Sequence, residues 1–304
     1  MTTHVVDPDR VPDGPLTPPG GVGGLLDVFR RRYLLKLLVK KELQARYEGS
    51  FLGMLWSYVQ PLVRFCMYYF VMGLVLNFSR GVENFAMHIF AGMVFVHFFT
   101  ETFTSGTRSI VKNKALVRKM ALPREMFPVA AMLVSAYHTF PQLLILTAGA
   151  VMSGWDPGAL ETAEPVLAGL LGFAIIAVFG TALALLFSAA NVFFRDFQNF
   201  VQTVGIFVTW SVPMIYPFSR LTKSPLGGTW VETVYLANPI AEAVLLLQYG
   251  FWVPTTTDPA VTLATEMPDH LFTRGLIVLA VSFVVLGISQ WVFSRLEGKF
   301  AERL

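Results

Sequence analysis

The chain has 304 residues, of which 54% are hydrophobic and 14% charged, and its formal net charge is +3. Soluble globular domains contain about 25% charged residues, so this composition excludes an ordinary soluble fold and indicates a membrane protein. The excess of basic residues is too small to indicate a nucleic-acid partner. The single cysteine, Cys66, excludes a disulfide framework and a paired-cysteine metal site, and we expect it to be a small buried hydrophobic residue.

Residues 1–24 form a segment rich in Pro and Gly, with almost no apolar residues that could build a core. This composition predicts a disordered cytoplasmic tail. The segment lacks the basic start, apolar stretch and small cleavage-site residues of a secretory signal, so none is expected. In residues 25–50, by contrast, seven basic residues are interleaved with Leu and Val. That segment is too charged to span a bilayer and predicts an amphipathic helix in the membrane interface.

Six long apolar segments follow, at residues 52–76, 85–111, 127–152, 165–193, 197–216 and 275–293. Each is long enough to cross about 30 Å of hydrocarbon as a helix. The sequence therefore predicts an all-α integral membrane protein, with one six-span domain over residues 51–300.

A seventh apolar segment, residues 231–253, contains two glutamates and the pair Asn238-Pro239. Eighteen of the 23 Lys and Arg residues lie in the tail, the interfacial segment, two loops on the same side and the C-terminus. The positive-inside rule then places both termini in the cytoplasm, which requires an even number of crossings. We therefore predict two short re-entrant helices between the fifth and sixth spans, broken at Asn238-Pro239 because a proline inside a helix removes a backbone hydrogen bond.

The sequence shows no energy source of its own for transport. The nearest match to a GxxxxGK[ST] phosphate loop, Gly298-Lys299, is followed by Phe300 and has no upstream glycine at the right spacing. Ion-driven carriers usually have carboxylates or histidines inside their spans, and the fourth, fifth and sixth predicted spans have none. We expect no ATPase activity, no cofactor and no metal in this chain, so energy must come from a partner.

Arg64 lies half-way along the first predicted span, where an arginine costs about 2.5 to 3.5 kcal/mol on insertion scales. It can pair with Glu101 of the second span, or it can contact a lipid phosphate or a polar pore. His97 and Glu101 are four residues apart on one helix face, a spacing that metal ligands use. Because the sequence places no third ligand, hydrogen bonding between helices is the preferred interpretation.

Aromatic residues are concentrated in the first and fifth predicted spans. They can belong to interfacial belts and helix packing, or they can form a smooth lining along which a sugar polymer slides. The candidate lining residues are Trp56, Tyr58, Phe65, Tyr68, Tyr69, Phe207, Trp210 and Tyr216.

The loop 108–125 carries six basic residues among apolar ones. Residues 112–120 can form a short helix that ends before Pro123. The basic residues can serve only to fix the membrane topology. Alternatively, the helix can dock on a cytoplasmic partner, and its apolar residues favour this second interpretation. The candidate docking residues are Lys112, Ala115, Leu116, Lys119, Met120 and Leu122.

Four sequence runs occur in order along the chain. They are RYEGSFLG with LWS and QPL at residues 46–62, LVRK with LPRE and a later proline at 116–128, FRDF at 194–197, and PMIYP at 213–217 followed by Asn238-Pro239. Together they resemble the permease subunits of bacterial polysaccharide ABC exporters of the O-antigen and teichoic-acid type. The resemblance covers about residues 25–300. Glu48 departs from it, because the family commonly has a basic residue there.

The resemblance implies a homodimer of six-span permeases in the bacterial cytoplasmic membrane, each bound to a separate ATPase subunit that binds ATP and Mg. It implies that the complex moves a lipid-linked glycan from the inner to the outer leaflet. Residues 116–122 then resemble the coupling helix that touches the ATPase, and the Arg195-Asp196 turn resembles a second, minor contact. Arg46 and Arg64 are the candidate contacts for the lipid phosphate. The composition most resembles actinobacterial members that export cell-wall galactan on a polyprenyl pyrophosphate carrier.

Two other functions are compatible with the sequence. A membrane-embedded glycosyl- or phosphotransferase acting on polyprenyl substrates would need clustered Asp, Glu or His in cytoplasmic loops, and these loops offer little beyond Glu125 and Asp196. An ABC permease for drugs or small lipids would share the six-span plan without needing a stacked aromatic lining.

Overall fold

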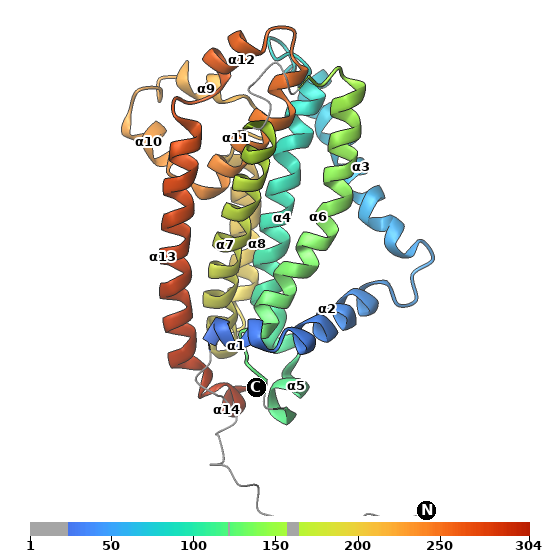
Figure 1. Ribbon diagram of the computed structural model, residues 1–304, viewed down its shortest axis with the longest axis vertical. Helices are drawn as coiled ribbons and strands as arrows, with labels where there is room; N and C mark the ends of the chain where they lie inside the picture. Colours follow the sequence, from blue (N-terminus) through green and yellow to red (C-terminus); the bar gives the residue numbers. More distant parts are fainter. Residues whose placement is uncertain (1–23, 121, 157–163) are drawn as a thin grey trace, which may run out of the picture.

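The computed structural model describes residues 24–120, 122–156 and 164–304, so the predicted tail lies outside the described residues except for Gly24. Every regular element in the described residues is a helix. The long helices stand side by side in one bundle, and α1 (Gly24–Arg30) and α14 (Phe300–Arg303) lie at the same end of it (Figure 1). We call this the basal end and the opposite end the apical end.

The interfacial segment forms two helices, where the sequence predicts one. α1 ends at Arg30, and α2 (Arg32–Tyr47) begins two residues later. Val28, Leu35 and Leu38 are buried in an apolar cluster at the basal end. α2 runs crosswise to the long helices (Figure 1), which is the placement expected of an amphipathic helix in the membrane interface.

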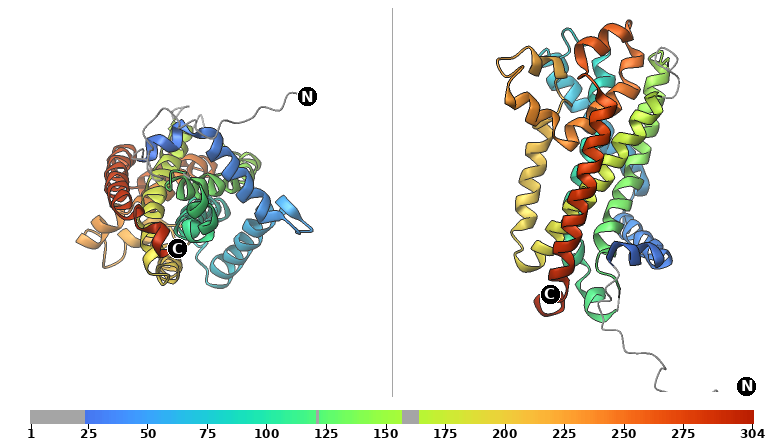
Figure 2. Two further views of the ribbon diagram at one scale, coloured as in Figure 1. Left: turned by 90° about the horizontal axis from the view of Figure 1, so that it is seen from below. Right: turned by 60° about the vertical axis from the view of Figure 1, so that its left-hand side comes forward.

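The chain passes alternately up and down the bundle (Figures 1 and 2). The passages are α3 (Trp56–Tyr68) with its continuation η2 (Tyr69–Val75), α4 (Phe85–Lys112), α6 (Met126–Met152), α7 (Glu164–Phe193), α8 (Phe197–Ser211) and α13 (Leu271–Glu297). Within the described residues, all of these except α8 are helices long and apolar enough to cross a membrane. The protein is thus a multi-pass, all-α membrane protein, as the sequence predicts.

The fifth passage differs from its predicted range, residues 197–216. α8 has 15 residues and ends at Ser211, so it is about 22 Å long. Val212 is extended, with φ −118° and ψ 158°, because the helical region is disfavoured for a residue before proline. The chain reaches α9 (Phe218–Thr222) at the apical end through a non-helical segment (Figure 2).

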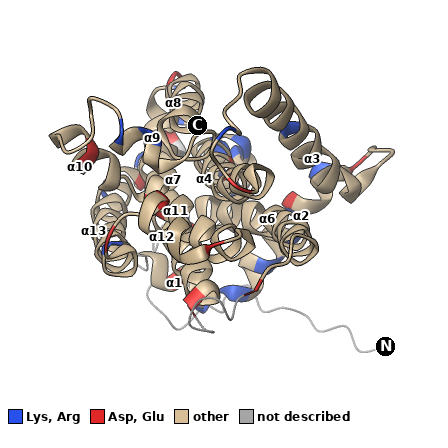
Figure 3. Cartoon of the chain, turned by 90° about the horizontal axis from the view of Figure 1, so that it is seen from above, with Lys and Arg blue, Asp and Glu red and all other residues tan. Residues whose placement is uncertain are grey.

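α3 stands apart from the other long helices when the bundle is seen from above (Figure 3). It follows a 3₁₀ turn, η1 (Gly53–Leu55), contains Pro61 and continues as the π-helix η2. Much of its surface is exposed, including Met67 and Cys66. The expectation of a buried Cys66 is therefore wrong, because this side of α3 faces away from the rest of the protein.

The predicted break at Asn238-Pro239 is confirmed. α10 (Trp230–Leu236) and α11 (Pro239–Phe251) are bent by 72° relative to each other. The Asn238 Oδ1 accepts a hydrogen bond from the Ile240 N–H at 3.0 Å, so Asn238 caps α11 while Pro239 occupies its first turn. α11 is buried along almost its whole length. A 3₁₀ turn, η4 (Val253–Thr255), and α12 (Pro259–Glu266) complete the apical end (Figure 1).

α4 and α7 pack at the centre of the bundle. A Cβ atom at Gly106 would lie 2.4 Å from the Ala184 Cβ, and one at Gly172 would lie 2.7 Å from the Phe95 ring. Glycine at these two positions therefore lets neighbouring side chains approach the helix backbones closely, as small residues do in membrane bundles. This close packing fixes the direction of α4, whose basal half carries most of the polar residues described next.

Candidate functional site

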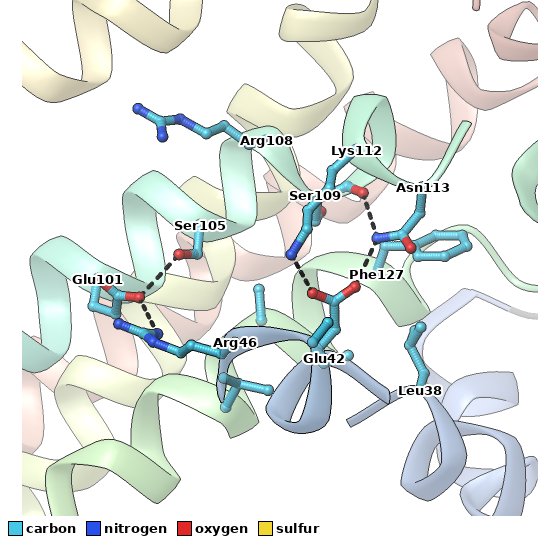
Figure 4. A pocket seen from close by; sticks show the side chains of 14 residues that line it. Leu38, Glu42, Arg46, Glu101, Ser105, Arg108, Ser109, Lys112, Asn113 and Phe127 are labelled. Atoms are coloured by element: carbon cyan, nitrogen blue, oxygen red, sulfur yellow. Dashed lines mark hydrogen bonds and ion pairs between the residues drawn. The ribbon is translucent and has the colours of Figure 1, made fainter. Parts of the chain in front are cut away.

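A polar cavity of about 420 Å³ opens between α2, α4 and α6 at the basal end (Figure 4). Its position follows from helical spacing, because residues four apart share a helix face and both α2 and α4 turn such a face toward it. Its charged lining residues are Glu42, Arg46, Glu101, Arg108 and Lys112. In Figure 4 the Arg108 guanidinium points away from the other charges, which form two separate pairs.

The first pair joins Arg46 of α2 to Glu101 of α4. Arg46 Nη1 lies 2.7 Å from Glu101 Oε1, and the Ser105 hydroxyl donates to the same oxygen at 3.1 Å. The predicted pair between Arg64 and Glu101 is therefore wrong. Arg46 reaches Glu101 because α2 crosses the basal end beside α4, whereas Arg64 lines a separate small cavity between α3, α4 and α8.

The second pair joins α2 to the last turn of α4. Lys112 Nζ lies 2.5 Å from Glu42 Oε2, and Asn113 Nδ2 donates to Glu42 Oε1 at 3.1 Å. Lys41 Nζ donates in turn to Asn113 Oδ1 at 2.7 Å. Burial acts to raise the pKa of Glu42, but the bonds from Lys112 and Asn113 outweigh burial and bring that pKa below its usual value. An ionised Glu42 thus fixes α2 to the point where α4 ends.

Glu42 is a site residue that the sequence motifs do not predict. The signal available was an acidic residue within a strongly basic segment, one helical turn before Arg46. Lys112, which the sequence analysis grouped with the docking residues, belongs to α4 and pairs with Glu42 instead of joining the short helix.

The predicted short helix after α4 is confirmed. α5 (Lys114–Lys119) is held against the bundle by Val117, whose side chain is only 5% exposed. Ala115, Lys119 and Met120 are exposed, whereas Leu116 is half-buried. The residues that the sequence analysis assigned to docking thus lie largely on the outer side of the helix, and Val117, which it did not consider, provides the inner contact. Leu122, just beyond α5, is also half-buried.

Arg195 and Asp196 form the turn between α7 and α8, at the same end of the bundle as α5 (Figure 2). Both side chains are exposed. Asp196 directly precedes the first turn of α8, where the helix dipole favours a carboxylate. Their role in binding a partner stays a prediction.

The candidate lining residues divide by exposure into an exposed group and a half-buried group. α3 and α8 lie on either side of α4 (Figures 2 and 3). Phe207 and Trp210 of α8 are 72% and 51% exposed, and Trp56 is exposed at the start of α3. Phe65, by contrast, is half-buried and packs edge-to-face on Phe90 with ring centroids 5.3 Å apart, so it takes part in the packing of α3 on α4, and its role as a lining residue stays a prediction. The other half-buried members of the set are Tyr58, Tyr68, Tyr69 and Tyr216.

Arg64 lines a small cavity of about 90 Å³ between α3, α4 and α8. Tyr68, His97 and Thr209 contribute to the same cavity. This small cavity lies beside the aromatic residues of α3 and α8. It is therefore on the side of the protomer where the aromatic lining is predicted.

His97 makes the hydrogen bond between helices that the sequence analysis prefers. Its Nδ1 lies 2.9 Å from the Gln142 Nε2 of α6. A second histidine, His138 of α6, contacts the hydroxyls of Tyr47 and Ser57, each at 3.0 Å. Local sequence patterns do not predict this cluster, because its members come from α2, α3 and α6. Among the described residues, no group of three or more His, Cys, Asp or Glu could hold a metal ion.

Comparison with known proteins identifies the family. Residues 33–252 match the family described as ABC-2 type transporter. Two O-antigen export system permease proteins RfbA from Klebsiella pneumoniae are each 26% identical to this chain over 275 residues, which cover 89% of this chain and 95% of the relative. The O-antigen export system permease protein RfbA of Myxococcus xanthus is 26% identical over 279 residues, which cover 91% and 98%. Because the family match spans both polar pairs, α5 and most of the bundle, this chain belongs to the ABC-2 type transporter family.

Proposed function

We propose that this chain is the membrane subunit of an ABC exporter that moves a lipid-linked polysaccharide across the bacterial cytoplasmic membrane. The observation that carries the proposal is the similarity to O-antigen export permeases, which extends over 89% to 91% of the chain. Two copies form a homodimer, and each binds a separate ATPase subunit that holds ATP and Mg²⁺. Membership of the ABC-2 family supports the ATPase partner.

The basal surface transmits the movement of the ATPase. Leu116 and Met120 of α5 contact the ATPase, and the Arg195-Asp196 turn adds a second contact. Val117 is buried against the bundle, so a push on α5 reaches the end of α4. From there the bonds of Glu42 carry the displacement to α2, because both Lys112 and Asn113 hold that carboxylate.

The conduit lies between the α3 and α8 helices of the two protomers. α3 stands apart from its own bundle (Figure 3), and the exposed Phe207 and Trp210 lie on α8. Flat aromatic rings contact the apolar faces of sugars without holding one register, so a polymer can slide past them. A second protomer or lipid must cover these rings, because exposed apolar surface of this kind is unfavourable in water.

Arg46 and Arg64 are the proposed contacts for the phosphate of the lipid carrier. The Arg46 side chain is 38% exposed although it is paired with Glu101, so an anion at the membrane surface can approach it. As the specific substrate we propose a cell-wall galactan on a polyprenyl pyrophosphate carrier. The composition and the Pro-rich N-terminal segment of the chain support that choice.

Reconstitution tests the proposed function. The permease is purified with the ATPase subunit that accompanies it, placed in lipid nanodiscs, and supplied in turn with different lipid-linked glycans. We expect one glycan class to stimulate ATP hydrolysis and to cross the bilayer in vesicles. If a drug or a short-chain lipid stimulates hydrolysis and no glycan does, the chain is a small-lipid or drug permease. Glycosyl or phosphoryl transfer by the chain alone would identify a transferase.

Trp210→Ala and Tyr68→Ala are each expected to slow polymer export about fivefold, because a lost ring contact costs about 1 kcal/mol. The measurement is the amount of glycan that reaches the cell surface at equal permease levels. Trp291→Ala is the matched control, since Trp291 is also exposed but lies on α13 with Arg295 over its ring. Equal export by the Trp210 and Trp291 variants would assign these rings to packing.

The proposed topology places both termini in the cytoplasm and the apical end outside. In a Cys66→Ser background, a cysteine introduced at Ser224 is expected to react with a membrane-impermeant maleimide in intact cells. One introduced at Leu304 is expected to react only after the cells are opened. Labelling of the Leu304 position in intact cells would reverse the orientation.

A further inference from the structure

The side of α4 that its neighbours leave uncovered is polar. Between Met87 and Ile110, six residues of α4 are not fully buried, and all six are polar, namely His97, Thr100, Glu101, Thr104, Ser105 and Arg108. We call these six residues the polar stripe. A helix surface that faces lipid tails is apolar, whereas ionisable residues at membrane depth face protein or water. The polar stripe therefore indicates a path for water or for a polar ligand along α4.

Arg108, at the basal end of the polar stripe, is the cation of the basal cavity that has no partner among the described residues. Arg46 pairs with Glu101 and Lys112 pairs with Glu42, but within the described part of the chain no hydrogen bond or ion pair involves Arg108. Of its three side-chain nitrogens only Nε is both buried and without a partner. Nη1 and Nη2, which also lack partners, are therefore accessible to a ligand. In Figure 4 the guanidinium points away from Glu42 and Glu101, so neither carboxylate occupies it.

The bonds between α2 and α4 indicate the depth of Arg108 in the membrane. α2 is bonded to Glu101 and to Lys112 of α4, and Arg108 lies between these two residues. An amphipathic helix in the interface lies at the boundary between headgroups and acyl chains, so Arg108 lies close to the depth of the lipid phosphates. α4 continues from Arg108 to Lys112, about 6 Å further along its axis, before the chain reaches α5. Arg108 is thus set back from the basal surface that α5 offers to the ATPase.

We propose that Arg108 binds the diphosphate of the polyprenyl lipid carrier, with Nη1 and Nη2 donating to two of its oxygens. The planar fork of a guanidinium matches two phosphate oxygens, which an ammonium group does not. Phe127, Ala130 and Val134 of α6 form an apolar wall of the same cavity, and this wall suits the hydrocarbon next to the diphosphate. The inference rests on the proposed function. It adds to the phosphate contacts a cation that no carboxylate of the described residues neutralises.

The rest of the polar stripe favours a carrier that bears sugars over an ordinary phospholipid. From Arg108 the stripe extends toward the apical end as far as His97, about 16 Å along the helix axis. Thr104 and Thr100 lie between them on the same side of α4, and both are only half-buried. Sugars attached to a diphosphate at Arg108 would have these polar residues beside them. The acyl chains of a phospholipid would instead meet a polar surface, which is unfavourable.

Binding is measured with farnesyl diphosphate, a short polyprenyl diphosphate, on the full-length permease with its ATPase in phosphatidylcholine nanodiscs. ADP with Mg²⁺ fills the nucleotide sites of the ATPase, and empty nanodiscs correct for partition into lipid. Arg108→Gln is expected to weaken binding about tenfold, the effect of losing charge-assisted hydrogen bonds. Arg108→Lys is expected to weaken it about threefold, because the charge remains without the fork. Inorganic pyrophosphate should compete about tenfold less well than unlabelled farnesyl diphosphate, because it lacks the hydrocarbon.

Arg295→Gln is the matched control. Arg295 is an exposed arginine at the basal end of α13, and its guanidinium lies 4.7 Å from the centre of the Trp291 ring. A general attraction of the diphosphate to basic residues would involve Arg295 as well, so we expect this variant to bind farnesyl diphosphate like the wild type. Because Arg108 makes no bond within the described residues, Arg108→Gln without ligand should unfold at the wild-type temperature. A purely structural role of Arg108 would lower that temperature.

Three results would overturn the inference. The first is equal affinity of the wild type and Arg108→Gln for farnesyl diphosphate. The second is equal competition by inorganic pyrophosphate, or loss of binding in nanodiscs that contain phosphatidylglycerol, since a free anion or an ordinary phospholipid then takes the site. The third is release of the ATPase by Arg108→Gln, which would place Arg108 in the subunit interface. Each result leaves the proposed function intact as long as the reconstituted wild type exports a lipid-linked glycan, and failure of that export would overturn the proposed function instead.

Discussion

Replacing Leu116 and Met120 together by Asp is expected to release the ATPase subunit and to abolish export. Met120 is 49% exposed and Leu116 is half-buried on α5, so a partner can cover both. Two carboxylates in an apolar contact cost at least about 2 kcal/mol, which is more than tenfold in affinity. The measurement is the amount of ATPase that purifies with the full-length permease, followed by export in the same cells.

A matched double variant separates this effect from a general effect of added charge. Leu226 and Val261 are exposed apolar residues at the apical end, and replacing both by Asp should leave ATPase binding unchanged. Val117 should not be used, because it is buried and its replacement would detach α5 from the bundle. Wild-type amounts of ATPase on the Leu116/Met120 variant would refute the coupling role of α5.

The long helices could be predicted because their signal is local. The segments 85–111 and 127–152 agree closely with α4 (Phe85–Lys112) and α6 (Met126–Met152), since a run of apolar residues longer than the bilayer is thick has few alternatives to a helix. The end of α8 could also have been predicted, because Pro213 restricts Val212. The break between α1 and α2 carries no such signal, as neither proline nor glycine lies near Arg31.

The polar pairs at the basal end could not be predicted from the sequence. Arg46 and Glu101 are 55 residues apart, and their contact depends on the direction in which α2 crosses the bundle. That direction is set by the burial of Val28 and Leu38 in the basal apolar cluster, which is a tertiary property. Among residues at membrane depth the sequence offers Arg64 as a possible partner for Glu101, because Arg46 lies outside every predicted span.

Arg46→Ala is expected to destabilise the permease. It leaves Glu101 without its cation at a site where the glutamate side chain is 22% exposed. Breaking a fully buried pair costs about 3 to 5 kcal/mol, and access of water lowers this to about 1 to 2 kcal/mol here. Lys36→Ala is the matched control, because Lys36 is an exposed residue of the same helix, α2, and takes part in none of the three ion pairs found in the described residues. Thermal unfolding of the purified variants measures both, and an Arg46→Ala protein as stable as the wild type would contradict the prediction.

The double variant Arg46→Ala/Glu101→Gln then separates the two roles of Arg46. The amide of the introduced glutamine removes the orphaned charge and can still accept the hydrogen bond that Ser105 donates to Glu101, so stability is expected to return close to that of the wild type. If Arg46 serves only to neutralise Glu101, export returns as well. If Arg46 also contacts the phosphate of the lipid carrier, as we propose, the double variant is stable but exports poorly, because no cation replaces the guanidinium. Full export by a stable double variant would therefore remove Arg46 from the substrate path and leave it as the bond that holds α2 to α4.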